Sequence, residues 1–391
     1  ASPQITLRRL DRDMHPVQAK ELRARKNGTV VVSQGETHES LQLDTDPDKA
    51  RRKLKKLDKD FQEKLAKVSR SQRIAYFTVG HGERSTSPRE DEVGLKLVKE
   101  VLQQLNYKVK KLGLNDGLSN AVPEDATVVF VVGPTVAMLA AERDALLRYV
   151  REGGALVLML DPEEERPLEM EPLLEPLGLT RDRTLLAHET KFVTMKKAKA
   201  DRAFLATNRF TSHDSTPTLS KNSSRMFVLF NETGTLEKLE GAPGKDAGGP
   251  DVQFTVRSMS GTFGDLNGDL EHDSADEKKK VWQLVAAVQL PPAEGAEGKG
   301  GRALVTADAD VLADYVVGAS RGNQQFLVDA LRWLEDEVEL SGEVAEIEDV
   351  AILHTKDEDK AWFWGTTLGM PLLVLGFGLL GGRMRRRRTT R

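Results

Sequence analysis

The loop Gly80-His81-Gly82-Glu83 carries the residues of this chain with the clearest potential for chemistry. It follows the apolar run 74–79, and ligands of open α/β sheets bind where such loops leave the carboxyl ends of strands. The two glycines let the backbone approach a ligand closely, while His81 and Glu83 offer polar groups to it. The alternative is a tight loop in which both side chains satisfy neighbouring backbone groups.

Asp308 and Asp310 follow a second apolar run, 303–306. If this run is a strand of the same sheet, both carboxylates lie at the same edge as the loop 80–83 and can converge with it on a polar ligand or partner. The alternative is that they cap the helix that follows.

A third polar segment places oxygen-bearing side chains at alternate positions: Asp265, Asn267, Asp269, Glu271 and Asp273. This spacing resembles the start of a calcium-binding loop. Leu270 stands where the EF-hand pattern needs glycine, and no helical pattern flanks the segment. Calcium is therefore the one cofactor that the sequence leaves open, beside the alternative of a polar turn.

Several classes of chemistry are excluded by composition. The chain has no cysteine, which excludes disulfides, thiolate metal sites and cysteine nucleophiles. It also has no GxSxG nucleophile elbow and no GxxxxGK[ST] phosphate loop, and its seven histidines lack zinc spacing. Acidic residues number 61 against 57 basic ones, so a nucleic-acid partner is not indicated. We expect a protein that is not an enzyme.

The elements that must position these residues follow an α/β rhythm. Near-continuous apolar strands alternating with amphipathic helices predict a parallel sheet covered on both faces. The expected strands are 74–79, 107–112, 127–132, 155–160, 282–290 and 303–306, and the expected helices are 90–105, 140–152 and 323–334. We expect one α/β domain over 71–340, with a mostly β insertion at about 185–280.

The N-terminal part is organised differently. Residues 1–45 predict a β-α-β-β segment, with strands at 5–10, 29–33 and 38–43 around a short helix at 17–22. Such a segment is too short to bury a core alone and looks like the second half of a domain. Residues 46–70 predict a charged linker helix with one narrow apolar face.

The C-terminal part predicts a membrane anchor. Residues 361–382 contain no charged side chain, and as a helix they would span about 30 Å, the thickness of a bilayer core. A juxtamembrane segment, 341–360, precedes them, and the tail 383–391 holds six arginines. Basic residues are retained on the cytoplasmic side, so the bulk of the chain would be extracytoplasmic, on the inner membrane. The alternative is a buried helix with a solvated basic tail.

Four sets of motifs resemble the auxiliary, substrate-binding-like subunit of the gliding-motility-type ABC transporter family. The most specific is YFTVGHGE at 76–83. The others are LDRDMHP at 10–16 with NGTVVV at 27–32; VPEDA at 122–126 with GP at 133–134 and YVREGG at 149–154; and ADAD at 307–310 with GN at 322–323 and LRWL at 331–334.

The resemblance implies a class I glutamine-amidotransferase-like, flavodoxin-like central domain and a partial thioredoxin-like N-terminal segment. It also implies an ABC permease and its ATPase as partners. We therefore expect a non-catalytic, membrane-anchored, extracytoplasmic subunit that binds a small ligand, an envelope polymer or a partner protein. The alternatives are a degenerate hydrolase-like enzyme of the cell envelope and a structural scaffold of an envelope or motility machine.

Overall fold

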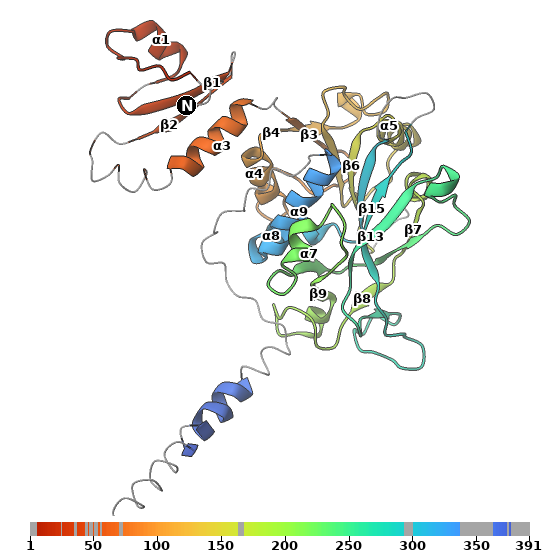
Figure 1. Ribbon diagram of the computed structural model, residues 1–391. Helices are drawn as coiled ribbons and strands as arrows, with labels where there is room; N and C mark the ends of the chain where they lie inside the picture. The colour runs from red at the N-terminus through yellow and green to blue at the C-terminus, as the bar shows by residue number, and fades with distance from the viewer. Residues whose placement is uncertain are drawn as a thin grey trace, which may run out of the picture. The chain divides into compact units, whose positions relative to one another are not determined.

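The computed structural model describes residues 6–24, 26–34, 37–43, 46, 50, 54, 57–69, 73–162, 168–292, 300–336, 363–373 and 375–376 (Figure 1). The chain divides into two compact units. The first is Ala1–Arg73 together with Gln103–Lys108, and the second is Ile74–Leu102 with Val109–Arg391.

In the first unit the described residues form a two-stranded antiparallel sheet and two helices. The elements are α1 (Pro16–Glu21), β1 (Thr29–Gln34), β2 (Thr37–Gln42) and α3 (Leu57–Ser69). The expected linker helix packs against both strands, and Lys64 on α3 forms an ion pair with Glu39 on β2 at 2.7 Å. The strand predicted over 5–10 is wrong for residues 6–10, which have no regular secondary structure and pair with neither β1 nor β2 in the structure.

An eight-stranded mixed sheet forms the centre of the second unit. Its strands, in spatial order, are β4 (Tyr107–Leu112), β3 (Arg73–Thr78), β5 (Val128–Val132), β6 (Ala155–Met159), β16 (Arg302–Thr306), β15 (Gln283–Gln289), β13 (Asp251–Arg257) and β10 (Arg209–Phe210). Strands β3, β5, β6 and β16 are parallel, whereas β15, β13 and β10 continue the sheet in antiparallel pairs. The predicted α/β class with a parallel sheet is confirmed, and the first five strands have the flavodoxin-like order 2-1-3-4-5.

Both faces of the sheet are buried. Val129 and Val131 on β5 belong to a core that includes side chains of α5 (Ala140–Arg151) and α6 (Glu171–Leu174). Phe130 points to the opposite face, where its ring stacks on that of Phe77 at 4.5 Å. The helices α4 (Lys96–Gln104) and α9 (Arg321–Leu334) lie away from α5 (Figure 1), and α9 contacts β16.

The region expected as a mostly β insertion is indeed rich in short strands. Three antiparallel pairs are formed by β7 (Leu179–Asp182) with β12 (Thr235–Lys238), β8 (Leu185–Ala187) with β14 (Phe263–Asp265), and β9 (Phe204–Thr207) with β11 (Val228–Asn231). Two short helices, α7 (Pro217–Lys221) and α8 (Asp314–Ala319), pack with α9. Two strands of this region, β10 and β13, also form the antiparallel edge of the main sheet. The region is therefore part of the same sheet and is not a separate insertion.

The expected anchor falls partly outside the described residues. Of 361–382, the structure describes 363–373 and 375–376, which are helical in large part and include a π-helical turn, Gly365–Gly369. In the described part of the chain, no helix has the length and apolar character needed to cross a bilayer. Residues 341–360 and 383–391 also lie outside that part.

Candidate ligand site at the carboxyl end of the sheet

The loop 80–83 lies across the carboxyl ends of β3 and β5. The His81 carbonyl accepts hydrogen bonds from the N–H groups of Thr135 and Val136, at 2.8 and 2.9 Å. The N–H of Arg84 donates to the Val132 carbonyl at 3.0 Å. Between β3 and β5 the strand order reverses, which is where doubly wound sheets open a crevice.

Gly82 is required by the close approach of this loop to Thr135. Its φ is +78°, and a Cβ at this position would lie 1.9 Å from Thr135 Oγ1. Gly117 has a similar φ, +93°, but open space around it. We expect Gly117→Ala to lower the free energy of unfolding by about 1–2 kcal/mol through backbone strain, and Gly82→Ala to lower it by about a further 1–3 kcal/mol through the clash. Denaturant titration of both variants measures the difference between their free energies of unfolding. If both variants lose the same free energy, the contact with Thr135 does not exclude a Cβ at position 82.

His81 is held between two carboxylates. Its Nε2 lies 3.0 Å from Glu142 Oε2, and its Nδ1 lies 3.4 Å from Glu83 Oε1. Glu83 also accepts the N–H of His81 at 2.7 Å, and the fully buried Glu142 accepts the N–H of Leu139 at 2.9 Å. Both ring nitrogens of His81 therefore face carboxylates. The tight-loop alternative expected backbone partners instead, and of the two side chains Glu83 has one, the N–H of His81.

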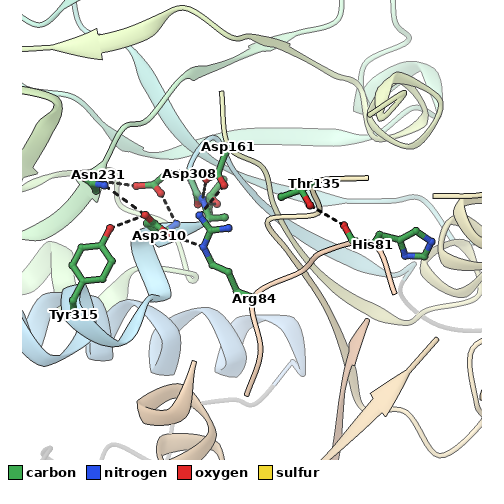
Figure 2. A network of polar contacts seen from close by, with 10 residues as sticks. His81, Arg84, Thr135, Asp161, Asn231, Asp308, Asp310 and Tyr315 are labelled. Carbon is green, nitrogen blue, oxygen red and sulfur yellow. Dashed lines mark hydrogen bonds and ion pairs between the residues drawn. The ribbon is translucent and has the colours of Figure 1, made fainter. Parts of the chain in front are cut away.

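Asp308 and Asp310 join a second network, which Figure 2 shows. Arg84 is its only cation among the residues labelled there: Nε donates to Asp310 Oδ1 at 2.6 Å, and Nη2 donates to Asp161 Oδ2 at 2.8 Å. Tyr315 donates its hydroxyl to Asp310 Oδ2 at 2.6 Å. The network joins the ends of β3, β6 and β16 to α8.

Asp308 is fully buried and is held by backbone groups. Its Oδ2 accepts the N–H of Asn231 at 2.8 Å, and its Oδ1 accepts the N–H of Asp310 at 2.6 Å. Burial, with the charges of Asp310 and Asp161, raises the pKa of Asp308 well above its ordinary value. Burial also raises the pKa of Asp161, although Arg84 opposes this shift. The cluster thus carries more carboxylates than its single arginine neutralises.

Arg84 links the two predicted groups of site residues, the loop 80–83 and the pair Asp308 and Asp310. The sequence pattern did not indicate it. It follows Glu83 directly, and its ion pair with Asp310 spans 226 residues. Sequence reasoning also missed Asp161, Asn231, Tyr315 and Glu142. Asp161 could have been found, since it follows an apolar strand just as Asp308 does. The remaining residues lie on elements whose positions the local pattern does not indicate.

A small cavity opens on the β4 side of the loop. Its volume is about 170 Å³, and its walls include Phe77, Val79, Gly80, Gly82, Arg84 and Lys111. Glu83 also borders this cavity, whereas His81 does not. Lys111 on β4 forms no ion pair with any described residue. The cavity therefore offers an apolar floor, two glycines and a cation that has no carboxylate partner among the described residues.

The acidic loop at 265–273 uses its oxygens internally. Asp265 accepts the N–H groups of Gly268 and Leu270, at 2.9 and 3.0 Å. Further bonds of this kind join Asn267 to the N–H of Asp269, Asp269 to that of Glu271, and Asp273 to that of Ala275. Glu271 instead pairs with Lys199 and Arg202. Among the described residues no group of three or more acidic, histidine or cysteine side chains is placed to hold a metal, so calcium binding by this loop stays a prediction.

Comparisons with known proteins find similarity in solved structures alone. No family model matches the chain, and no curated protein matches it. The mmIFT52 N-terminal domain is 13% identical, with a TM-score of 0.47 over 70% of this chain and 100% of that one. A ThuA-like protein from Parabacteroides merdae is 10% identical, with a TM-score of 0.42 over 73% and 98%. An exo-β-1,4-mannosidase from an Opitutaceae bacterium is 10% identical, with a TM-score of 0.33 over 73% and 39%.

Proposed function

We propose that this chain is a non-catalytic auxiliary subunit of an ABC transport complex. In this proposal its α/β unit lies outside the cytoplasm and binds a small ligand or a partner protein. The residues 361–382 anchor it in the inner membrane, and the arginines of 383–391 stay in the cytoplasm. The permease and ATPase subunits are its partners in the membrane.

A binding role without catalysis is supported by one observation: the polar side chains at the sheet edge are paired with one another. His81 is enclosed by Glu83 and Glu142, and Arg84 is enclosed by Asp161 and Asp310. A general base or acid must reach the proton that it transfers, and these groups are instead occupied with one another. The cavity beside them is suited to holding a small ligand through Lys111 and backbone groups.

The anchoring role is supported by the composition of the C-terminal part. An uncharged run of this length followed by six arginines is typical of a single membrane span with a cytoplasmic end. In the described part of it, Leu372 and Leu373 are exposed, by 64% and 57%, so these apolar side chains lack a protein environment of their own. A bilayer would supply one.

Isolation of the full, tagged chain from native membranes tests the proposal. The wild-type chain should co-purify with an ABC permease and its ATPase after gentle solubilisation. The matched variant Leu372→Arg with Leu373→Arg should lose both partners, because each arginine costs about 3 kcal/mol at the centre of a membrane helix. Recovery of the wild-type chain without either partner would refute the transport role.

A further inference from the structure

A second and larger cavity lies at the antiparallel edge of the sheet, on strands that take no part in the site described above. We call it the edge pocket. Its volume is about 450 Å³, within the usual range for ligand sites. The residues used in the argument below are Lys238, Asp251, Gln253, Phe254, Arg257 and Gln283. They come from β12, β13 and β15.

The edge pocket carries excess positive charge. Arg257 is partly buried, its Nε is inaccessible to solvent, and its guanidinium has no acceptor among the residues described. Lys238, on the adjacent β12, is exposed and also forms no ion pair within the described part of the chain. The one acid in the lining, Asp251, is engaged by Lys245 at 2.8 Å. A partly desolvated guanidinium without a counter-ion is costly, and a bound carboxylate would offset that cost.

The groups around these cations are suited to hydroxyls. Gln283 lies directly opposite Arg257 in the register of β13 and β15, so both side chains leave the same face of the sheet. Gln253 is exposed on the same strand as Arg257. Each amide both donates and accepts hydrogen bonds, as a sugar hydroxyl requires of its partners. Phe254, next along the strand, is opposite Ala286 and packs against the core, so it supports the pocket from behind and does not contact the ligand.

We propose that the edge pocket binds an acidic saccharide, with Arg257 and Lys238 holding the carboxylate and Gln253 and Gln283 holding the hydroxyls. The ligand class follows from the combination of cations and amides in one pocket. A simple anion would leave the amides unused. A neutral sugar would leave Arg257 without a counter-ion.

The test uses the full chain in mild detergent and three probes: glucuronate, glucose and acetate. Saturation-transfer difference NMR titrations should show binding of glucuronate at least about 10-fold tighter than of either other probe, since a charge-assisted hydrogen bond contributes about 1.5–3 kcal/mol. Arg257→Met should weaken glucuronate binding about 10- to 100-fold. The matched control is Arg151→Met, which removes the same charge from an exposed position on α5.

Two further measurements make the outcome decisive. The circular dichroism spectra and the unfolding midpoints of Arg257→Met and Arg151→Met must agree. If Arg257→Met fails to fold, Lys238→Met takes its place. Because Lys238 is an exposed charge, this variant should weaken glucuronate binding about 3- to 10-fold. Absence of glucuronate binding, equal binding of acetate or glucose, or unchanged binding by the folded variants would each overturn the proposal. None of these outcomes bears on the membrane partners, which are tested separately.

Discussion

Arg84→Met should lower the free energy of unfolding by about 3–5 kcal/mol, because it leaves buried carboxylates without their cation. The side chains of Arg84 and Asp310 are only 15% and 13% exposed, and Asp161 is 27% exposed. Met preserves most of the volume of the Arg84 stem, so the loss reports on charge rather than on a cavity. Urea or guanidinium unfolding curves measure it.

Arg89→Met provides the control for Arg84→Met. Arg89 lies in the same segment but is 85% exposed, and its ion pair with Glu92 is 3.7 Å long. Exposed pairs of this kind contribute less than about 1 kcal/mol. If both variants lose similar amounts of stability, the Arg84 network does not hold the sheet edge together.

The loss of unfolding free energy in Arg84→Met should depend on pH, and the raised pKa values of the neighbouring carboxylates give the direction of that dependence. The folded-state pKa of Asp161 and of Asp308 is raised above the ordinary value of 3.8, so the folded protein binds more protons than the unfolded one. The stability linked to such groups is fully present below that ordinary value and is lost as the pH rises through the raised pKa. Removal of Arg84 raises the pKa of Asp161 further. The difference in the free energy of unfolding between Arg84→Met and the wild type should therefore become smaller as the pH falls through the raised pKa of Asp161, because protonation removes the unpaired buried charge in the variant.

His81→Ala should be comparably damaging, with an expected loss of about 3–5 kcal/mol. Glu142 is fully buried, and the N–H of Leu139 would be its remaining partner of those described above. Glu142 Oε1 already lacks a hydrogen-bond partner among the described residues. Loss of the imidazole thus leaves a buried carboxylate almost unsupported. Thermal unfolding and denaturant titration both measure this loss.

A double variant separates the charge effect from the loss of packing. His81→Ala with Glu142→Ala removes the buried carboxylate as well, so it should recover much of the loss despite the missing cap at Leu139. His15→Ala is the control, since His15 is exposed in the first unit, and it should change stability by less than about 0.5 kcal/mol. A double variant no more stable than His81→Ala would assign the loss to packing instead.

The amino-acid pattern was sufficient to predict most of the sheet but not all the element boundaries. The runs 128–132 and 155–159 are apolar throughout, and the structure places them as buried parallel strands. The helix expected from residue 90 begins at Lys96 instead. Ser85 forms a bridge with Gly94, and its carbonyl accepts the N–H of Leu95, so these residues are committed to a tertiary contact before the helix starts.

The anchor and the calcium loop show two other limits of the sequence. The anchor is a prediction from hydropathy, and most of its flanks lie outside the described residues. The alternate spacing of oxygens in 265–273 indicated calcium, but the same spacing lets Asp265 and its neighbours accept N–H groups of their own loop. Side-chain type and spacing are identical in both cases, so only the backbone conformation distinguishes them.

The sequence by itself determined the parallel strands of the central sheet, and hence that the loop 80–83 and Asp308 and Asp310 stand at strand ends. That information is local, because burial and periodicity are read over a few neighbouring residues. Only the tertiary structure decided which of these groups meet. Strand order places Arg84 against Asp161 and Asp310, and helix α5 places Glu142 against His81. These contacts join residues far apart in the chain, so no pattern of neighbouring residues indicates them.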